Sequence, residues 1–416
     1  MKHAWKTRVG VALLSLSLLT SLCGCLQTAQ TPQTSQPGTT VQDNHAIPPC
    51  ENRIFSLPGL SWTSSADGKG FYVPQIRFLN YYDPEVGIQV PLCSQSGCYH
   101  TDQSCEAYLA ERVTGFVDYN GTWYVLSLEN STSAALWKVE PKSHQRTKVF
   151  ELTSQEPGES YYFSSGFLSH GYAYLDVYHD IISPDGDNTY SNSFLRVQLD
   201  TGEAQTLFEN QYINLLGAGE DRVLIAVSIS ASTPLSEEAY LEQTPGGNYD
   251  DYLEDFHTTH NPATEKMELR EYTADLSSYQ VLANGYIRGN MVPGMANWGD
   301  LTLYAVENEL YLYNLATGES RPVEFPGTLI NFHFIDGRII LLARDPDLKV
   351  YYADLEGGPA QLLKDEGDRE GVSFSVHGEC QDYMYGIYSE GEGSGTCIIP
   401  KEDYWAQRFD NTIPVS

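Results

Sequence analysis

The chain has 416 residues, of which 24 are Lys or Arg and 55 are Asp or Glu, and its formal net charge at pH 7 is −31. So acidic a chain is a poor partner for nucleic acid or anionic lipid headgroups, because both bind clustered basic side chains. Cations, neutral sugars and basic peptides fit this charge better; the alternative is that the charge only keeps an extracellular domain soluble.

The first 25 residues have the pattern of a secretory signal. Three basic residues precede the apolar run Val9–Leu22, which is shorter than the roughly 20 apolar residues of a membrane span. The run ends in "LCGC" (22–25), which resembles a bacterial lipobox apart from the Cys at its variable position. By that resemblance residues 1–25 are a lipoprotein signal peptide and Cys25 becomes the lipidated N-terminus. The alternative is an ordinary cleaved signal with an incidental Cys.

Residues 26–50 are rich in Gln, Thr, Pro and Ser and have few large apolar side chains. Such a segment cannot bury enough surface to offset its chain entropy, so we expect a disordered tether. It would hold residues 51–416 at the extracytoplasmic face of the cell membrane, with the lipid as the only membrane contact. Loss of residues 1–24, which carry three basic residues and no acidic one, would lower the net charge by three to −34.

A strand–turn–strand unit recurs through residues 51–416. Each unit has two strands joined by a polar turn, and an alternating apolar strand such as "GTWYVLSL" (121–128) precedes most of them. The turns "DTGE" and "ATGE" place Gly where a tight hairpin needs a positive φ. The two-strand units are 78–92, 135–150, 194–208, 268–282, 309–325, 350–364 and 382–401.

Period-2 alternation with many Tyr, Val and Ile is typical of half-buried strands, and few helices are expected. Seven units at spacings of about 40–50 residues predict an all-β protein, a β-propeller of seven blades, with six or eight as alternatives. The rival fold is a string of β-sandwiches, against which the repeated hairpin turn argues. We expect residues 51–58 to complete the last blade and close the ring.

The run "NYYDPEVGIQVPLCSQSGCYHTDQSCEAYL" (80–109), placed soon after a lipobox and tether, resembles a group of bacterial propeller lipoproteins of unknown function. Their layout is related to the TolB-like and domain-of-unknown-function propellers. The resemblance implies the propeller architecture and brings no reaction with it.

Four candidate ligands lie within thirteen residues, in the pattern C-x4-C-x-H-x4-C: Cys93, Cys98, His100 and Cys105. Three thiolates and one imidazole form a tetrahedral zinc set, and Gly97 would permit the turn that Cys98 and His100 need. The competing interpretation, which we prefer at this point, is three disulfides and no cofactor, because six Cys remain outside the signal. The other three are Cys50, Cys380 and Cys397. A catalytic thiol is the weakest alternative.

The longest insertion, residues 231–266, is predicted to contain a short helix inside one blade. Its acidic and imidazole side chains are candidate ligand-binding residues, and the plain alternative is a solvated acidic face on a helix packed by tyrosines. The candidates are Asp250, Asp251, Tyr252, Asp255, His257 and His260. If the strand order holds, this insertion shares one face of the propeller with the other loops between second and third strands.

No G-x-S-x-G or H-E-x-x-H motif appears. We therefore expect a binding or scaffold protein for a glycan, a peptide or an envelope partner, without catalysis of its own and without nucleic acid. The alternative is a glycan-cleaving propeller with paired carboxylates, whose separation in space the sequence does not give. The oligomeric state is left open.

Overall fold

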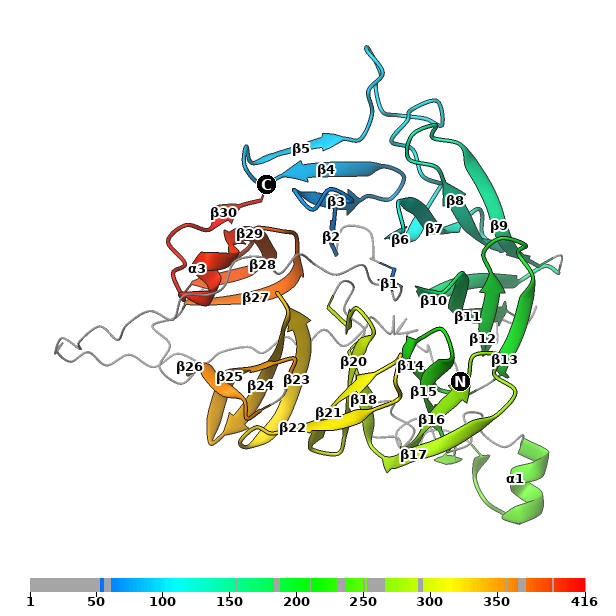
Figure 1. Cartoon of the computed structure of the whole chain (residues 1–416). Helices are drawn as coiled ribbons and strands as arrows, with labels where there is room; N and C mark the ends of the chain where they lie inside the picture. The colour runs from blue at the N-terminus through cyan, green and yellow to red at the C-terminus, as the bar shows by residue number, and fades with distance from the viewer. Residues whose placement is uncertain are drawn as a thin grey trace, which may run out of the picture. The chain divides into compact units, whose positions relative to one another are not determined.

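The structure, a computed structural model, describes residues 53–55, 61–154, 156–182, 188–209, 211–229, 237–249, 251–252, 266–290, 295–356, 358–365, 372–390 and 393–415, with the backbone alone at 188–190, 239, 364–365 and 372–373. In this described part the chain forms seven antiparallel sheets, and the helices are two short ones. Figure 1 shows the sheets arranged around a centre, as in a seven-bladed β-propeller. The predicted fold class and blade number are confirmed.

Each blade is a meander that runs from an inner strand to an outer one. Blade 1 consists of β2 (Thr63–Ser64), β3 (Phe71–Pro74), β4 (Leu79–Asp83) and β5 (Ile88–Pro91). Blade 2 consists of β6 (Val113–Tyr119), β7 (Thr122–Leu128), β8 (Ser133–Val139) and β9 (Arg146–Thr153). Blade 3 consists of β10 (Glu159–Ser169), β11 (Tyr172–Ile182), β12 (Asn188–Gln198) and β13 (Ala204–Glu209).

The remaining four blades follow the same order, and within the described residues blade 5 has its inner strand in two pieces. Blade 4 consists of β14 (Ile213–Ala218), β15 (Arg222–Ser228), β16 (Met267–Thr273) and β17 (Tyr279–Gly285). Blade 5 consists of β18 (Ile287–Gly289), β19 (Asn297–Trp298), β20 (Leu301–Val306), β21 (Glu309–Asn314) and β22 (Ser320–Val323). Blade 6 consists of β23 (Thr328–Ile335), β24 (Arg338–Asp345), β25 (Asp347–Asp354) and β26 (Gln361–Asp365). Blade 7 consists of β27 (Val372–Glu379), β28 (Tyr383–Glu390), β29 (Gly393–Pro400) and β30 (Ile413–Pro414), with α3 (Lys401–Trp405) between the last two.

Turn sequences account for the hairpins. In blade 6, Asp336 and Gly337 join the first two strands at φ values of 50° and 69°. Two successive positive φ values define the type I′ turn, whose twist matches that of paired strands. Gly202 and Gly318, in the two "TGE" turns, also have positive φ, at 73° and 76°, as the sequence predicts.

The hydrophobic core lies between neighbouring blades. Seven clusters of buried residues fill the seven interfaces, for example Leu126 and Leu136 of blade 2 against Leu168 and Leu175 of blade 3. A strand inside a propeller is therefore apolar on both faces over its middle, as in β15, where six of seven residues are buried. Stability is thus distributed around the ring rather than concentrated in one centre.

The ring closes differently from our expectation for residues 51–58. The described part of that segment, β1 (Arg53–Ile54), pairs with β10, the inner strand of blade 3, and the prediction that it completes the last blade is wrong. The outer strand of blade 7 is β30, near the C-terminus. Blades 7 and 1 meet through side chains, where the rings of Trp62 and Tyr385 stack with centroids 4.2 Å apart. The buried aromatic rings can hold blades 7 and 1 together without a strand shared between them, because side-chain packing does not require the two chain ends to pair in one sheet.

The meanders define two faces of the ring. Inner strands all run the same way, so the connections between second and third strands open on the same face as the connections between blades. We call this the loop face and the opposite one, which carries the first and third hairpin turns of each blade, the turn face. The connection β5–β6, the connection β11–β12 and the insertion between β15 and β16 all begin at the loop face. Among the described residues, no helix is both long and apolar enough to cross a membrane.

Candidate metal centre

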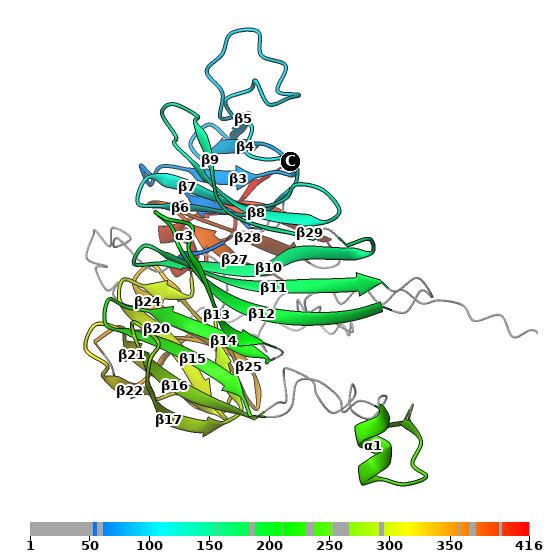
Figure 2. The same cartoon turned by 90° about the vertical axis from the view of Figure 1, so that its right-hand side faces the viewer.

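The connection from blade 1 to blade 2 holds the four candidate ligands. It follows β5, and Figure 2 shows it projecting from the rim of the ring. Its second half is tied to the segment between β3 and β4: the Leu109 N–H donates to the Arg77 carbonyl at 2.8 Å, and the Leu79 N–H donates to the Ala107 carbonyl at 2.8 Å. Phe78, Ala107 and Tyr108 form a small apolar base beneath the loop. The tip therefore stands on an ordered support.

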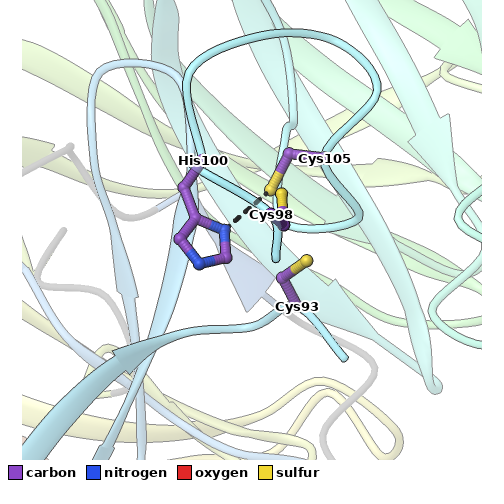
Figure 3. A group of neighbouring side chains, drawn as sticks. All are labelled: Cys93, Cys98, His100 and Cys105. Carbon is purple, nitrogen blue, oxygen red and sulfur yellow. Dashed lines mark hydrogen bonds between the residues drawn. The ribbon is translucent and has the colours of Figure 1, made fainter. Parts of the chain in front are cut away.

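The side chains of Cys93, Cys98, His100 and Cys105 point toward one another (Figure 3). One possible ligand atom from each residue can be chosen such that all four lie within 4.8 Å of one another. His100 Nδ1 and Cys105 Sγ lie within hydrogen-bonding distance, at 3.2 Å. Cys105 is buried and the other three are half-buried.

Two residues with left-handed backbone make this convergence feasible. Gly97 has a φ of 76° and His100 a φ of 54°, so the chain reverses on both sides of Cys98. The turn expected at Gly97 is present. Outer contacts brace the loop: the Ser94 N–H and hydroxyl both donate to the Glu106 carboxylate, at 2.6 and 2.8 Å. These contacts tie together the two ends of the loop that carries the four side chains.

The thiols differ in their electrostatic surroundings. Burial raises the pKa of Cys105 to about 12, and its neighbours Cys98 and Cys93 add to the effect. Burial acts in the same direction on Cys93, but hydrogen bonds from the backbone N–H groups of Gln95 and Glu106 and from the Cys98 and Cys105 thiols together outweigh it and lower the pKa of that thiol. Within the loop, Cys93 thus loses its proton more readily than the buried Cys105 does.

The remaining cysteines lie elsewhere. Cys380 and Cys397 are buried in blade 7, and both are free thiols in the structure, as are the three of the loop. Burial raises the pKa of Cys380 to about 11, which is the property of an inert core thiol. Cys50 and the lipidation candidate Cys25 lie outside the described residues. A disulfide involving Cys50 stays a prediction.

The insertion in blade 4 contains the predicted short helix, α1 (Glu237–Gln243). Its tyrosines pack on one another: the rings of Tyr240 and Tyr252 stack with centroids 4.6 Å apart, and Tyr249 lies beside both. Of the six candidate ligand-binding residues only Asp251 and Tyr252 are described. The other four, Asp250, Asp255, His257 and His260, lie outside the described residues.

Blade 3 carries a feature that the sequence did not reveal. Its first three strands have 11 residues each, against eight or fewer in every other described strand. Residues 159–163, 177–182 and 188–193 therefore form an extension, which we call the flange; Figure 2 shows its strands reaching past those of the neighbouring blades. The tyrosines of residues 161–178 were visible in the sequence, but the uncertain strand ends concealed the extension.

Aromatic pairs cover both sides of the flange. The Tyr161 ring stacks on the His179 ring, with centroids 4.3 Å apart and planes 9° apart. On the opposite side Tyr162 stacks on Tyr178 at 5.3 Å, also at 9°. All four side chains are half-buried. The His179 imidazole lies 3.3 Å from the Glu159 carboxylate, which also accepts from the Ser154 hydroxyl at 2.7 Å.

A buried ionic cluster on the turn face also escaped sequence analysis. Lys401 Nζ lies 2.7 Å from the Glu379 carboxylate and 3.0 Å from the Asp336 carboxylate. The Asp336 N–H donates to Glu379, and the Trp405 indole donates to Asp336 at 2.8 Å. Burial raises the pKa of Glu379, while Lys401 acts against that shift. The members come from positions 65 residues apart, so no local motif marks them.

Comparisons with known proteins identify no family for this chain. No protein-family profile matches the chain, and neither does any curated protein. Among solved structures, puromycin hydrolase aligns over 87% of this chain and 53% of its own, with 9% identity and a TM-score of 0.48. Prolyl endopeptidases align over 70% of this chain and 41% of theirs, with 12% identity and a TM-score of 0.46. The chain therefore spans about half the length of these peptidases or less. The β-propeller domain of the Trilobed protease from Pyrococcus furiosus, described as an open velcro topology, aligns over 71% of this chain and 81% of its own, with 10% identity and a TM-score of 0.32.

Proposed function

We propose that the chain is a lipid-anchored, extracytoplasmic β-propeller that binds a glycan, a peptide or an envelope partner on its loop face, without catalysis of its own. The flange is the observation that carries the binding role. Its half-buried aromatic side chains offer stiff contact area with polar tips, which is the usual chemistry of sugar and peptide recognition.

The rigidity of the flange supports this role. A flange whose three strands are continuous with blade 3 is held by the ring, so its aromatic side chains lose little conformational freedom when a ligand binds. The acidic balance of the chain, −31 overall, favours neutral or cationic ligands over anionic ones. The loop face also bears the blade 4 insertion, whose packed tyrosines are of the same kind.

The binding role can be tested with a double variant, Tyr162→Ala with Tyr178→Ala. We expect the wild-type chain to bind members of a glycan or peptide array, and the double variant to bind them about tenfold more weakly or worse, as the loss of a contacting aromatic predicts. The matched control is Tyr279→Ala on β17, which is 50% exposed and borders a hairpin on the turn face. Equal binding by the flange variant and the wild type would contradict the proposal.

The anchor can be tested separately through Cys25→Ser. The lipid supplies the membrane affinity and the tether none, so this variant should appear in the medium or stay unprocessed. Fractionation followed by immunoblotting measures the distribution. Unchanged membrane association of the variant would reject the anchor and leave the binding role untouched.

A further inference from the structure

We propose that Cys93, Cys98, His100 and Cys105 bind one Zn²⁺ ion, and that this ion organises the tip of the connection between blades 1 and 2. The distances between the ligand atoms are close to those of a zinc site. In a zinc tetrahedron, bonds of about 2.3 Å to sulfur and about 2.0 Å to nitrogen place neighbouring ligand atoms about 3.5–3.8 Å apart. The four side chains offer ligand atoms within 4.8 Å of one another, so side-chain adjustments of about an ångström complete the tetrahedron.

The donor set selects the metal. Three thiolates and one imidazole are soft ligands, which favour zinc and disfavour magnesium and calcium, whose ligands are oxygens. Four protein ligands also fill the tetrahedron and leave no position for a water or a substrate. Such a site is structural, in agreement with the proposed function, in which the propeller has no catalysis of its own.

A disulfide explains the cluster less well. Three thiols meet at one point, and a bond between any two would leave the third thiol and the imidazole without a role. The even count of six Cys favoured three disulfides only if Cys380 and Cys397 also needed partners. Both are buried in blade 7 as free thiols, where Cys packs as a small apolar residue, so they make no such demand.

The backbone gives an independent argument. His100 has a φ of 54°, in the left-handed region that non-glycine residues seldom occupy. This conformation turns its imidazole toward the thiols, while the side chain of the preceding residue, Tyr99, is 88% exposed. A loop with so small an apolar base has few means to hold such an arrangement, and a metal ion shared by four residues supplies one.

The test uses the full-length chain, prepared metal-free with a chelator and a thiol reductant and then titrated with Zn²⁺. Elemental analysis should find one zinc per chain, and Co²⁺ in its place should give the absorption bands of tetrahedral sulfur coordination. Cys98→Ser and His100→Asn should each weaken zinc binding about 100-fold or more. Asn is chosen because it tolerates the left-handed backbone at this position.

Matched controls sit beside the site. Tyr99→Ala, between two ligands, and Cys397→Ala, a buried thiol in blade 7, should both keep one zinc per chain with unchanged affinity. The proposal is overturned if the reduced wild-type chain takes up no zinc, or if Cys98→Ser and His100→Asn bind it as tightly as the wild type. It is also overturned if the protein isolated without reductant has a disulfide among Cys93, Cys98 and Cys105 and the reduced form still binds no metal. None of these outcomes depends on the flange or the lipid.

Discussion

Two clusters of ionisable side chains differ in where they lie: one is in the packed ring and the other is in a single loop. The cluster of Lys401, Glu379 and Asp336 sits in the ring on the turn face and contains its own cation. The loop cluster, from Cys93 to Cys105, has three thiols and an imidazole around one point and no Lys or Arg among its four members. In the ring cluster the carboxylates need a cation, since an unpaired buried charge is costly. In the loop cluster the thiols lose their protons and become charged when they bind a metal ion. The ring supplies that cation with a residue of the chain, whereas by our proposal the loop takes it up as a zinc ion.

The difference follows from how far the members are separated along the chain. Lys401 and Asp336 meet only because blades 6 and 7 are packed together, so the cluster can form only in the folded ring. The loop ligands span thirteen residues and need only two backbone reversals to converge. The ring cluster should therefore be coupled to global folding, and the loop cluster to local order.

The largest effect is expected from Lys401→Met. This change leaves the Glu379 carboxylate, whose side chain is 2% exposed, without its cation. Breaking a buried pair by removing one partner costs about 3–5 kcal/mol. The free energy of unfolding of the whole ring, measured by urea denaturation, should fall by that amount.

The control for this prediction removes both charges of the Lys401–Glu379 pair. Lys401→Met combined with Glu379→Gln should recover most of the lost stability, because the amide oxygen can still accept from the Asp336 N–H. A loss below about 1 kcal/mol for the single variant would show that a proton, water or another cation relieves the charge of Glu379. In that case the contrast between the ring and the loop would disappear.

Features that depend on short-range patterns could be predicted from the sequence. Seven blades follow from alternating strands and glycine turns such as those at Gly202 and Gly318, and the four loop ligands are visible as a motif because they are neighbours in the chain. The helix α1 was foreseen for the same reason.

Long-range features were not foreseen. The pairing of β1 with β10 contradicts the expected closure. It was missed because a two-residue strand has no pattern of its own and its partners lie 113 and 115 residues away in the chain. The stacking of Trp62 on Tyr385 joins the two ends of the ring and replaces the strand exchange that we expected. The flange depends on where strands end, which alternation alone does not fix.

The smallest effect on global stability is expected from removing zinc from the loop. If zinc orders only the tip, chelation of the wild type should change the unfolding free energy of the ring by less than about 1 kcal/mol, because the loop cluster lies outside the seven core interfaces. The local effect should be large. Tyr99, 88% exposed between two ligands, is a target for chymotrypsin, and cleavage there needs a flexible backbone.

Limited proteolysis followed by mass spectrometry measures this difference. The zinc-loaded chain should resist cleavage after Tyr99, and both the chelated chain and Cys98→Ser should be cut there while the ring stays intact. Tyr99→Ala should remove that cut in every state, which identifies the site. A ring that unfolds on chelation would contradict the local role, because it would mean that the loop cluster, like that of Lys401, is coupled to the fold as a whole. The two clusters would then differ only in the source of their cation. The separation of a cluster's members along the chain would no longer predict whether the cluster is coupled to local order or to global folding.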